Sequence, residues 1–376
     1  MQPVGDGGGS EHALIGMLRQ LAADGWSCHV AVPGPVRLAA EYAAAGATVH
    51  VLPMPRLTTS GGPLRWVRFA AAWPLVVARL VRLVRGVGAG VVHTNSLHSW
   101  YGWAAAWLTR RPHVWHAREI VFQSRAALGV ERFLARRFAT TVIAVSGAVA
   151  AQLDPANVVT IVDDADPDRF GPDRAGRFRT AAGLPDGVPL IGSVARIDTW
   201  KGFGVLLDAF PLVAARRPEV LLVIAGSPVP GKEAYADELR RRAGGLTGVH
   251  WMGHRGDVPE LMADLDLFVL ATTEPEPFGL VIVEALASGV PVVAGAAGGP
   301  LDILGPAARG ESPAGRLVTP GDPGVLAGAI CDLLPAGGST AAGRRARPPL
   351  RAPQPGRFAP VFDQLVEPGR SAATSR

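Results

Sequence analysis

The sequence predicts an α/β protein made of two doubly wound, Rossmann-like domains. Short apolar runs typical of buried parallel strands alternate with helical patterns in residues 27–162 and again in residues 190–294. Residues 163–173 are acidic, contain Pro and lack an apolar period, which indicates a linker. A chain of 376 residues is long enough for two hydrophobic cores. We therefore expect domains at residues 1–165 and 166–340, followed by an Arg- and Pro-rich tail at residues 341–376.

In the first domain, strands are expected at residues 27–32, 47–52, 90–93, 113–117, 140–145 and 158–162. A glycine run, Gly7, Gly8 and Gly9, precedes a predicted helix over residues 12–23. It could be a plain turn or a loop whose backbone comes close to a ligand. Such a loop normally follows a strand, but residues 1–4 are too few and too polar to form one. We therefore expect that the first strand of this sheet is missing and that the natural start lies further upstream.

In the second domain, strands are expected at residues 190–194, 220–225, 267–271 and 291–294. Arg196 and Lys201 follow the first of these strands, at the sheet edge where open parallel sheets bind ligands. Lys201 is one of only two lysines in a chain with 35 arginines, so it is a distinctive choice at this place. The two cations could together neutralise a pyrophosphate. The alternative is a pair of ordinary surface cations.

A second loop of this domain leads from the strand at residues 267–271 into a predicted helix at residues 279–286. The first N–H groups of a helix have no partner within the helix, and the helix dipole favours an anion there by about 0.3–1 kcal/mol. Gly279 leaves room for a phosphate, Glu284 could accept hydrogen bonds from a ribose diol, and Glu276 could do so from a sugar hydroxyl. A solvated loop explains the spacing of the two glutamates equally well, so the surrounding sequence must decide.

Two strand ends of the first domain also carry polar residues. His116 ends the run at residues 113–117 and is followed by Arg118, whereas Asn95 follows the run at residues 90–93. A histidine so placed could donate a hydrogen bond to a transferring sugar, or it could be a satisfied core residue. Asn95 could contact an acceptor, and we assign Arg118 to substrate binding.

Together these motifs resemble the retaining glycosyltransferases of glycosyltransferase family 4, which have the GT-B fold of two Rossmann-like domains facing a cleft. The resemblance covers roughly residues 5–335. Its donor-half segments are 192–202 (GSVARIDTWKG), 251–257 (WMGHRGD), 274–284 (EPEPFGLVIVE), 288–293 (SGVPVV), 298–300 (GGP) and 315–322 (GRLVTPGD). In the first half it rests on 7–11 (GGGSE), 91–95 (VVHTN) and 115–119 (WHARE).

The resemblance implies a role for each candidate residue. Arg196 and Lys201 would bind the donor diphosphate, and Glu284 the ribose. Glu276 and the backbone of Phe278, Gly279 and Leu280 would hold the sugar and phosphate, and His116 would lie across the cleft near the anomeric centre. The resemblance also implies transfer with retention and without a metal or cofactor. The co-substrate would be a UDP or GDP type of sugar, and the acceptor a small molecule, a lipid-linked saccharide or a polysaccharide.

The chain departs from the family pattern at three places. Relatives usually have Asn-Gly-Val-Asp after the inter-domain strand, whereas residues 163–166 read DDAD, which puts the hinge in doubt. The glycine-rich loop at residues 298–302 ends in Asp instead of Glu. Relatives often carry a helix that crosses back to the first domain, and in the tail only residues 357–366 keep a helical period, interrupted by Pro360.

Composition excludes several other functions. The net charge of +5 comes from residues 340–376, which hold seven arginines and two acids, so the rest of the chain is neutral and no nucleic-acid partner is expected. Cys28 and Cys331 have no pairing pattern for a disulfide or a zinc site. We find no signal peptide, and the longest lipid-compatible run is far shorter than the roughly 20 residues of a membrane span. A cytoplasmic enzyme is expected, and the two-lysine composition is typical of a GC-rich bacterial genome.

Two aromatic segments leave alternatives open. Residues 63–85 carry five arginines, two tryptophans and no acid, so this helix could lie on the inner face of the membrane or simply be solvated beside the acceptor site. Trp100, Trp103 and Trp107 share one face of a predicted helix, which favours core packing over an aromatic acceptor platform.

The sequence therefore predicts a retaining glycosyltransferase. The alternatives are a nucleotide-sugar epimerase of the same fold and a nucleotide-sugar-binding protein without turnover. A nicotinamide-dependent dehydrogenase is disfavoured because no predicted strand is followed by GxGxxG.

Overall fold

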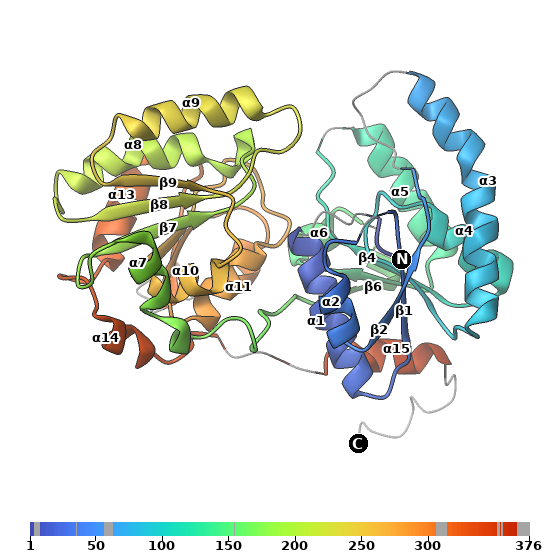
Figure 1. Ribbon diagram of the computed structural model, residues 1–376. Coiled ribbons are helices and arrows are strands. Elements are labelled where there is room, and N and C mark those ends of the chain that lie inside the picture. The colour runs from blue at the N-terminus through green and yellow to red at the C-terminus, as the bar shows by residue number, and fades with distance from the viewer. Residues whose placement is uncertain are drawn as a thin grey trace. The chain divides into compact units, whose positions relative to one another are not determined.

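The computed structural model describes residues 1–3, 8–34, 36–55, 63–122, 124–153, 155–305, 314–351, 354 and 356–366. The chain forms two compact units, which Figure 1 shows as separate α/β bodies. Unit 1 contains Met1–Asp163 and Gln354–Arg376, and unit 2 contains Asp164–Pro353. The predicted fold class is confirmed. The chain passes between the units twice, and the first passage lies two residues before the predicted boundary.

Unit 2 contains a six-stranded parallel sheet. Its strands are β7 (Leu190–Val194), β8 (Leu221–Ala225), β9 (Val249–Gly253), β10 (Leu267–Leu270), β11 (Val292–Gly295) and β12 (Gly315–Val318). The order β12-β11-β10-β7-β8-β9 places β7 beside β10, although two strands separate them in the chain. The strand order reverses there, and a doubly wound sheet opens a ligand crevice at such a point.

Helices cover both faces of this sheet, which explains why its inner strands are almost entirely apolar, with the buried Ser193 of β7 as the polar exception. Figure 1 shows α8 and α9 on one face and α7, α10 and α11 on the other. The helices are α7 (Arg177–Ala182), α8 (Phe203–Ala214), α9 (Glu233–Gly244), α10 (Val258–Asp264), α11 (Leu280–Ala287), α12 (Pro300–Leu304), α13 (Pro323–Leu333) and α14 (Ala341–Arg345). Leu206, Phe210, Leu239 and Ile330 belong with Ile224 and Val269 to one buried core cluster.

Unit 1 contains two parallel sheets, β1-β2 and β3-β4-β5-β6. The strands are β1 (Cys28–Val32), β2 (Ala47–Val51), β3 (Val92–Thr94), β4 (His113–Ala117), β5 (Thr141–Ala144) and β6 (Val158–Thr160). The backbone of Met1 and Gln2 joins the sheets. Gln2 N donates to Ala31 O at 2.9 Å, Met1 N donates to His93 O at 2.6 Å, and Asn95 N donates to Met1 O at 3.0 Å. These two residues thus lie between β1 and β3, where they bond to both neighbours like residues of a strand.

The helices of unit 1 are α1 (Gly9–Ala23), α2 (Ala39–Ala44), α3 (Pro63–Gly86), α4 (Tyr101–Thr109), α5 (Arg125–Phe138), α6 (Gly147–Ala151) and α15 (Ala359–Val366). The long α3 continues through Pro74 and buries Val76, Val77 and Leu80 in a cluster with Tyr101 and Ala104 of α4. Its apolar face is therefore used within unit 1. No helix in the described ranges is both long enough and apolar enough to cross a bilayer.

The tail serves both units. Helix α15 packs in unit 1, where Phe358 and Phe362 belong to the core cluster of α1 and β1. The preceding segment belongs to unit 2. There the fully buried Arg344 donates to Asp264 at 3.1 Å and to Asp186 at 2.7 Å. Arg347 and Arg179 both bond to the buried Asp266, at 2.6 and 2.9 Å.

Candidate functional site

The loops that follow β7 and β10 are bonded to each other at the reversal point of the unit 2 sheet. Thr273 N, after β10, donates to Trp200 O, after β7, at 2.9 Å. Gly202 has φ 72°, and a Cβ atom there would lie 1.7 Å from Ala271 O. Only glycine allows this approach, because any side chain would collide with the backbone that leaves β10. The Lys-Gly pair therefore fixes the first loop against the second.

Lys201 and Glu276, which the sequence placed on different loops, form an ion pair. Nζ of Lys201 donates to Oε2 of Glu276 at 2.6 Å, and the two side chains are only 12% and 9% exposed. The ammonium also lies 3.9 Å from the centre of the Trp200 ring. Sequence reasoning missed Trp200, although its place next to the distinctive lysine was a usable signal. The pair joins both loops through partly desolvated charges.

The segment around Glu276 is held by its backbone. Glu276 N donates to Ala297 O at 3.1 Å, and Gly299 N donates to Glu276 O at 2.7 Å. A Cβ atom at Gly298, which has φ 79°, would lie 2.1 Å from Glu276 O. The glycine-rich loop after β11 is therefore required for the backbone of the loop after β10 to take this course.

Helix α11 begins directly after this segment. Gly279 is its N-cap residue, with φ 95°, and Leu280 is its first residue. Phe278 is buried beside them. The left-handed Gly279 turns the chain so that a helix amino end, which favours anions, follows the Lys201–Glu276 pair.

Glu284 lies one turn into α11 and is buried. Burial raises the pKa of its carboxyl to about 7, although the positive charge of Arg169 acts in the opposite direction and lowers this pKa. Among the described residues no donor bonds to this carboxyl. Thr272 Oγ1 is likewise buried without a partner in the described part of the chain, and the sequence analysis did not single it out. Buried acceptors without donors are costly, so a ligand with a diol would satisfy Glu284.

Arg196 lies on the loop after β7, and its side chain is exposed. The next residue ties this loop to the one after β8, because Ile197 N donates to Ser227 O at 2.7 Å and Val229 N donates to Ile197 O at 3.2 Å. No described residue forms an ion pair with Arg196. Its guanidinium is available to a ligand, and its convergence with Lys201 on one diphosphate stays a prediction.

In unit 1, His116 lies on β4 and has no exposed surface. Its Nδ1 is 3.3 Å from Nε2 of His93, and its Nε2 is buried without a partner among the described residues. Burial, aided by the nearby Arg118 and His93, lowers the pKa of His116 well below the ordinary value of 6.5. The ring is therefore neutral at pH 7, which favours a hydrogen-bonding role over a charged one.

Asn95 and Arg118 form a closed network with Asp163. The guanidinium of Arg118 bonds to both carboxylate oxygens of Asp163, at 2.5 and 3.3 Å, and its Nε donates to Asn95 Oδ1 at 2.6 Å. The Asn95 amide donates to Gln2 Oε1 at 2.7 Å and Ser10 O at 3.1 Å. Asp163 is the first residue of the altered hinge sequence, and the sequence did not reveal its partner. The substrate roles of Asn95 and Arg118 stay predictions.

The glycine run is described only in part. Gly7 lies outside the described residues, Gly8 is the N-cap of α1 in an extended conformation, and Gly9 is the first residue of that helix. The helix thus begins three residues before the predicted start. In the described ranges no group of three or more His, Cys, Asp and Glu side chains is placed to hold a metal ion.

Both halves of the chain match family models of glycosyltransferases. Residues 8–161 match the glycosyl transferase 4-like domain, and residues 188–335 match the glycosyl transferases group 1. The two matches follow each other along the chain, and the loops after β7, β10 and β11 all lie within the second.

Curated relatives carry related names. The lipopolysaccharide core biosynthesis mannosyltransferase LpsB of Rhizobium meliloti is 34% identical over 48% of this chain and 58% of its own length. A GDP-mannose-dependent alpha-(1-6)-phosphatidylinositol monomannoside mannosyltransferase of Mycolicibacterium smegmatis is 30% identical over 71% of this chain and 66% of its own length. The chain spans about half the length of the curated relatives it matches.

Solved structures share the fold over nearly the whole chain. The structure of Anabaena HepE in complex with UDP and glucose has a TM-score of 0.73 and 26% identity, and the match covers 93% of this chain and 95% of HepE. WaaG, a glycosyltransferase involved in lipopolysaccharide biosynthesis, has a TM-score of 0.60 at 17% identity over 92% of this chain and 91% of its own, which shows the fold alone.

Proposed function

Because the chain belongs to the glycosyltransferases of the GT-B fold, we propose that it transfers a sugar from a nucleoside diphosphate to a hydroxyl group of an acceptor. One observation carries this proposal most directly. The Lys201–Glu276 ion pair joins the loops after β7 and β10 at the reversal point of the sheet, beside the helix start at Gly279. A cation, a carboxylate and a helix amino end in one place suit a ligand with a diphosphate and sugar hydroxyls.

The donor is proposed to be a UDP or GDP sugar. HepE is named in complex with UDP and glucose, and the mycobacterial relative is named as GDP-mannose-dependent. Among the residues that the structure describes, none donates a hydrogen bond to the carboxyl of Glu284, and a ribose diol would supply two donors. Neither the names of the relatives nor the Glu284 carboxyl distinguishes the uracil of UDP from the guanine of GDP. Both donor types therefore belong in the first experiment.

We infer that transfer proceeds with retention and without a metal ion. The bond between the anomeric carbon and the diphosphate oxygen would break, and the acceptor oxygen would bond to the anomeric carbon on the same face. The acceptor proton would pass to an oxygen of the departing phosphate. Arg196 and Lys201 would stabilise the charge that develops on this leaving group. Glu276 would accept a hydrogen bond from the sugar while it positions the ammonium of Lys201.

His116 is proposed to donate a hydrogen bond to the transferred sugar through its buried Nε2. A neutral ring can do this only with the proton on that nitrogen, in which case Nδ1 accepts from His93. Replacing His116 with Ala should lower kcat far more than it weakens donor binding. An equal loss in both would indicate a structural role.

The acceptor is proposed to be a small molecule, a lipid-linked saccharide or a polysaccharide, in keeping with the relatives named for lipopolysaccharide core and phosphatidylinositol mannosides. Peripheral contact of α3 with an anionic membrane is proposed as well. It would have to use the exposed face of that helix, because the apolar face packs on α4. Co-sedimentation with anionic liposomes at low salt tests it, and a protein that stays in the supernatant would end this part of the proposal.

The donor site can be tested with the two lysines of the chain. Thermal unfolding is measured with a panel of UDP, GDP and dTDP sugars, and the stabilising donor is then titrated against Lys201→Ala and the matched control Lys232→Ala. Loss of a buried charge contact to phosphate should weaken binding at least tenfold in Lys201→Ala and leave Lys232→Ala within twofold of the wild type. Equal binding by both variants would refute the site.

Product analysis tests the remaining points. With an acceptor found among saccharides and lipid-linked saccharides, NMR of the anomeric proton should show the configuration of the donor, and added chelator should leave the rate unchanged. An inverted product or a rate that needs a divalent cation would contradict the mechanism. Epimerised donor in a reaction without acceptor would identify the epimerase alternative instead.

A further inference from the structure

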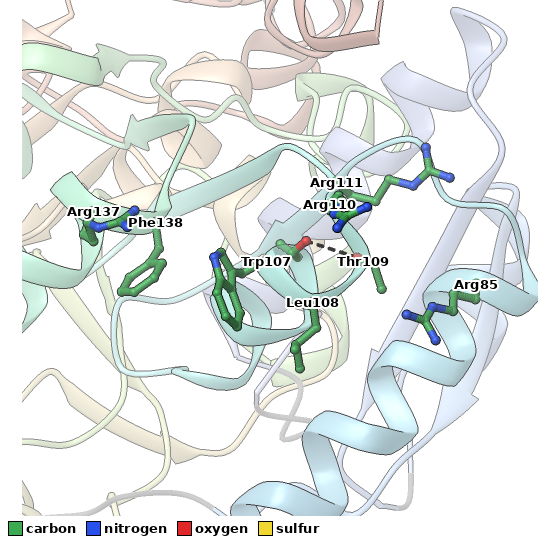
Figure 2. A pocket seen from close by; sticks show the side chains of 9 residues that line it. Arg85, Trp107, Leu108, Thr109, Arg110, Arg111, Arg137 and Phe138 are labelled. Carbon is green, nitrogen blue, oxygen red and sulfur yellow. Dashed lines mark hydrogen bonds between the residues drawn. The ribbon is translucent and has the colours of Figure 1, made fainter.

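A pocket lies in unit 1, at the edge of the sheet where its strands begin. Its volume is about 720 Å³, and it is lined by the ends of α3, α4 and α5 (Figure 2). These segments immediately precede β3, β4 and β5, which are parallel. The pocket is therefore at the amino edge of the sheet, whereas His116 and Asn95 are at or beyond the carboxyl ends of their strands. Five strand residues span about 15 Å, so the pocket is distinct from the candidate transfer residues.

Four arginines give this pocket its charge. Arg85 lies in the last turn of α3, Arg110 and Arg111 follow α4, and Arg137 lies at the end of α5 (Figure 2). All four side chains are exposed, and none of the described lining residues is acidic. Within the described part of the chain, Arg85, Arg110 and Arg111 have no ion pair, and Arg137 contacts only the ring of Phe138, at 5.2 Å.

The helix ends explain only part of this charge. Cations near the carboxyl end of a helix are favourable, because that end carries roughly half a negative charge. Three helix ends therefore amount to about 1.5 negative charges against four guanidinium groups. An excess of about 2.5 positive charges is left, which is more than enough to neutralise the roughly 1.5 to 2 negative charges of a phosphate monoester at pH 7.

Aromatic side chains line the same pocket. Trp107 is 61% exposed, so the prediction that it packs in the core with Trp103 is wrong. Phe138 forms the neighbouring wall, held by stacking on Trp103 at a ring distance of 4.2 Å. Exposed tryptophan beside unpaired arginines suits a ligand that has both an anionic group and an apolar or aromatic part.

Arg110 supplies an independent observation. It is the C-cap of α4 with φ 54°, and among the described residues it is the one non-glycine residue with positive φ. Glycine normally takes this position, because a side chain there is strained. The chain thus has an arginine in the pocket at a position whose positive φ favours glycine over any residue with a side chain.

We propose that this pocket binds a phosphate ester with an apolar or aromatic part, through Arg85, Arg110, Arg111 and Arg137. One guanidinium group can donate to two phosphate oxygens at once. Trp107 would contact the apolar part of the ligand. The volume is within the range of small-molecule sites, about 300–1,000 Å³. A soluble phosphorylated compound and a lipid headgroup share this chemistry, and the experiment separates them.

The test follows tryptophan fluorescence of the full chain during two titrations. One uses inorganic pyrophosphate, and the other uses phosphatidylcholine vesicles that contain phosphatidic acid. Pyrophosphate can also reach the proposed donor site, so the signal of the pocket is defined as the part that Trp107→Phe removes. The variant Arg110→Gln with Arg137→Gln is compared with the control variant Arg37→Gln with Arg216→Gln. The control pair removes the same charge from two exposed sites outside the pocket and outside α3, one in unit 1 and one in unit 2.

We expect a saturable signal that depends on Trp107 and whose midpoint rises at least tenfold in the pocket pair, with the control pair within twofold of the wild type. A response to pyrophosphate alone would support the site as one for a soluble ligand, and a response to vesicles alone would support a lipid headgroup. Equal weakening by both pairs, or no signal that depends on Trp107, would overturn the proposal. Arg110→Gly keeps the test valid if a Gln variant misfolds, because glycine suits the backbone there and should weaken binding without lowering Tm.

Discussion

The chemistry of Glu284 depends strongly on its surroundings. Its carboxyl is buried on α11 without a donor in the described part of the chain, and burial raises its pKa to about 7. Below pH 7 the carboxyl is mainly protonated, so only one of its two oxygens remains a full acceptor for the hydroxyl groups of a diol. Hydroxyl donors favour the carboxylate, so ligand binding and ionisation support each other.

Donor affinity should therefore rise with pH. If ligand returns the pKa of Glu284 to its ordinary range, binding of a UDP or GDP sugar strengthens about tenfold between pH 6 and pH 8. Nucleotide sugars are diphosphate diesters without a titration in this range, so the protein sets the profile. Calorimetric titration of wild type and Glu284→Gln measures it. The Gln variant should bind weakly with a flat profile, and a profile unchanged by the substitution would show that another group titrates.

Arg110 should reduce the stability of the protein. Replacing it with Gly removes a side chain from a left-handed position, and we expect the free energy of unfolding to rise by about 1 kcal/mol. Urea unfolding measures the change. Arg111→Gly is the matched control, because Arg111 is the next residue, is also exposed and does not have a positive φ. This control substitution should leave the free energy of unfolding unchanged or lower it. A gain in both variants would mean that charge repulsion, not backbone conformation, is relieved.

At the scale of elements, the candidate site depends on how closely two loops approach. Gly202 lets the loop after β7 touch the backbone after β10, and Gly298 lets the loop after β11 touch Glu276. Each is a left-handed glycine with backbone atoms where a side chain would be. The glycines thus shape the site more than any single charged residue does.

Gly202→Ala should be severely destabilising. Its Cβ would meet Ala271 O at 1.7 Å, so the two loops must separate, and we expect a loss of about 3 kcal/mol or more together with most nucleotide binding. Gly231→Ala is the control, since Gly231 also has positive φ, 86°, but open space around it. It should cost about 1 kcal/mol and leave binding intact. Similar losses of stability and binding in both variants would show that the positive φ, and not the contact with Ala271 O, causes the effect.

In the sheet of unit 2, the prediction of strands from sequence succeeded for the inner strands and failed at the two edges. The predicted strands match those of the structure within a few residues, but β9 and β12 were not predicted as strands. These two are the edge strands of the unit 2 sheet, and they are only partly buried and contain His250 and Arg316. An edge strand is covered less completely, so its apolar signal is weaker.

At the scale of the whole molecule, two different segments of the tail stabilise the two units. Phe362 lies in the core of unit 1, whereas Arg344 lies in the buried ionic network of unit 2. The sequence predicted one tail at residues 341–376, whereas the structure divides this segment between the two units. Short polar helices such as α14 carry little periodicity, and their burial depends on acids far away in the chain.

The two segments should act on separate units. Phe362→Ala should cost unit 1 about 3–5 kcal/mol. Arg344→Ala should cost unit 2 a similar amount, because the buried carboxylate of Asp264 would lose its ion-pair partner. Hydrogen exchange followed by mass spectrometry locates the effect. We expect faster exchange in β1 and β4 for the first variant and in β7 and β10 for the second. Faster exchange in the other unit, in either variant, would contradict the division of the tail.

The sequence by itself determined the alternation of strands and helices, the linker after residue 162, and the motifs that carry Lys201, Glu276 and Glu284. These follow from local patterns, because the period of apolar residues and the place of a glycine act over a few neighbours. Only the tertiary structure decided that β7 lies beside β10, that Lys201 pairs with Glu276 and Arg118 with Asp163, and that Trp107 is exposed. Such pairings join residues 45 or 75 positions apart, and their free energy depends on burial by groups that no local pattern contains.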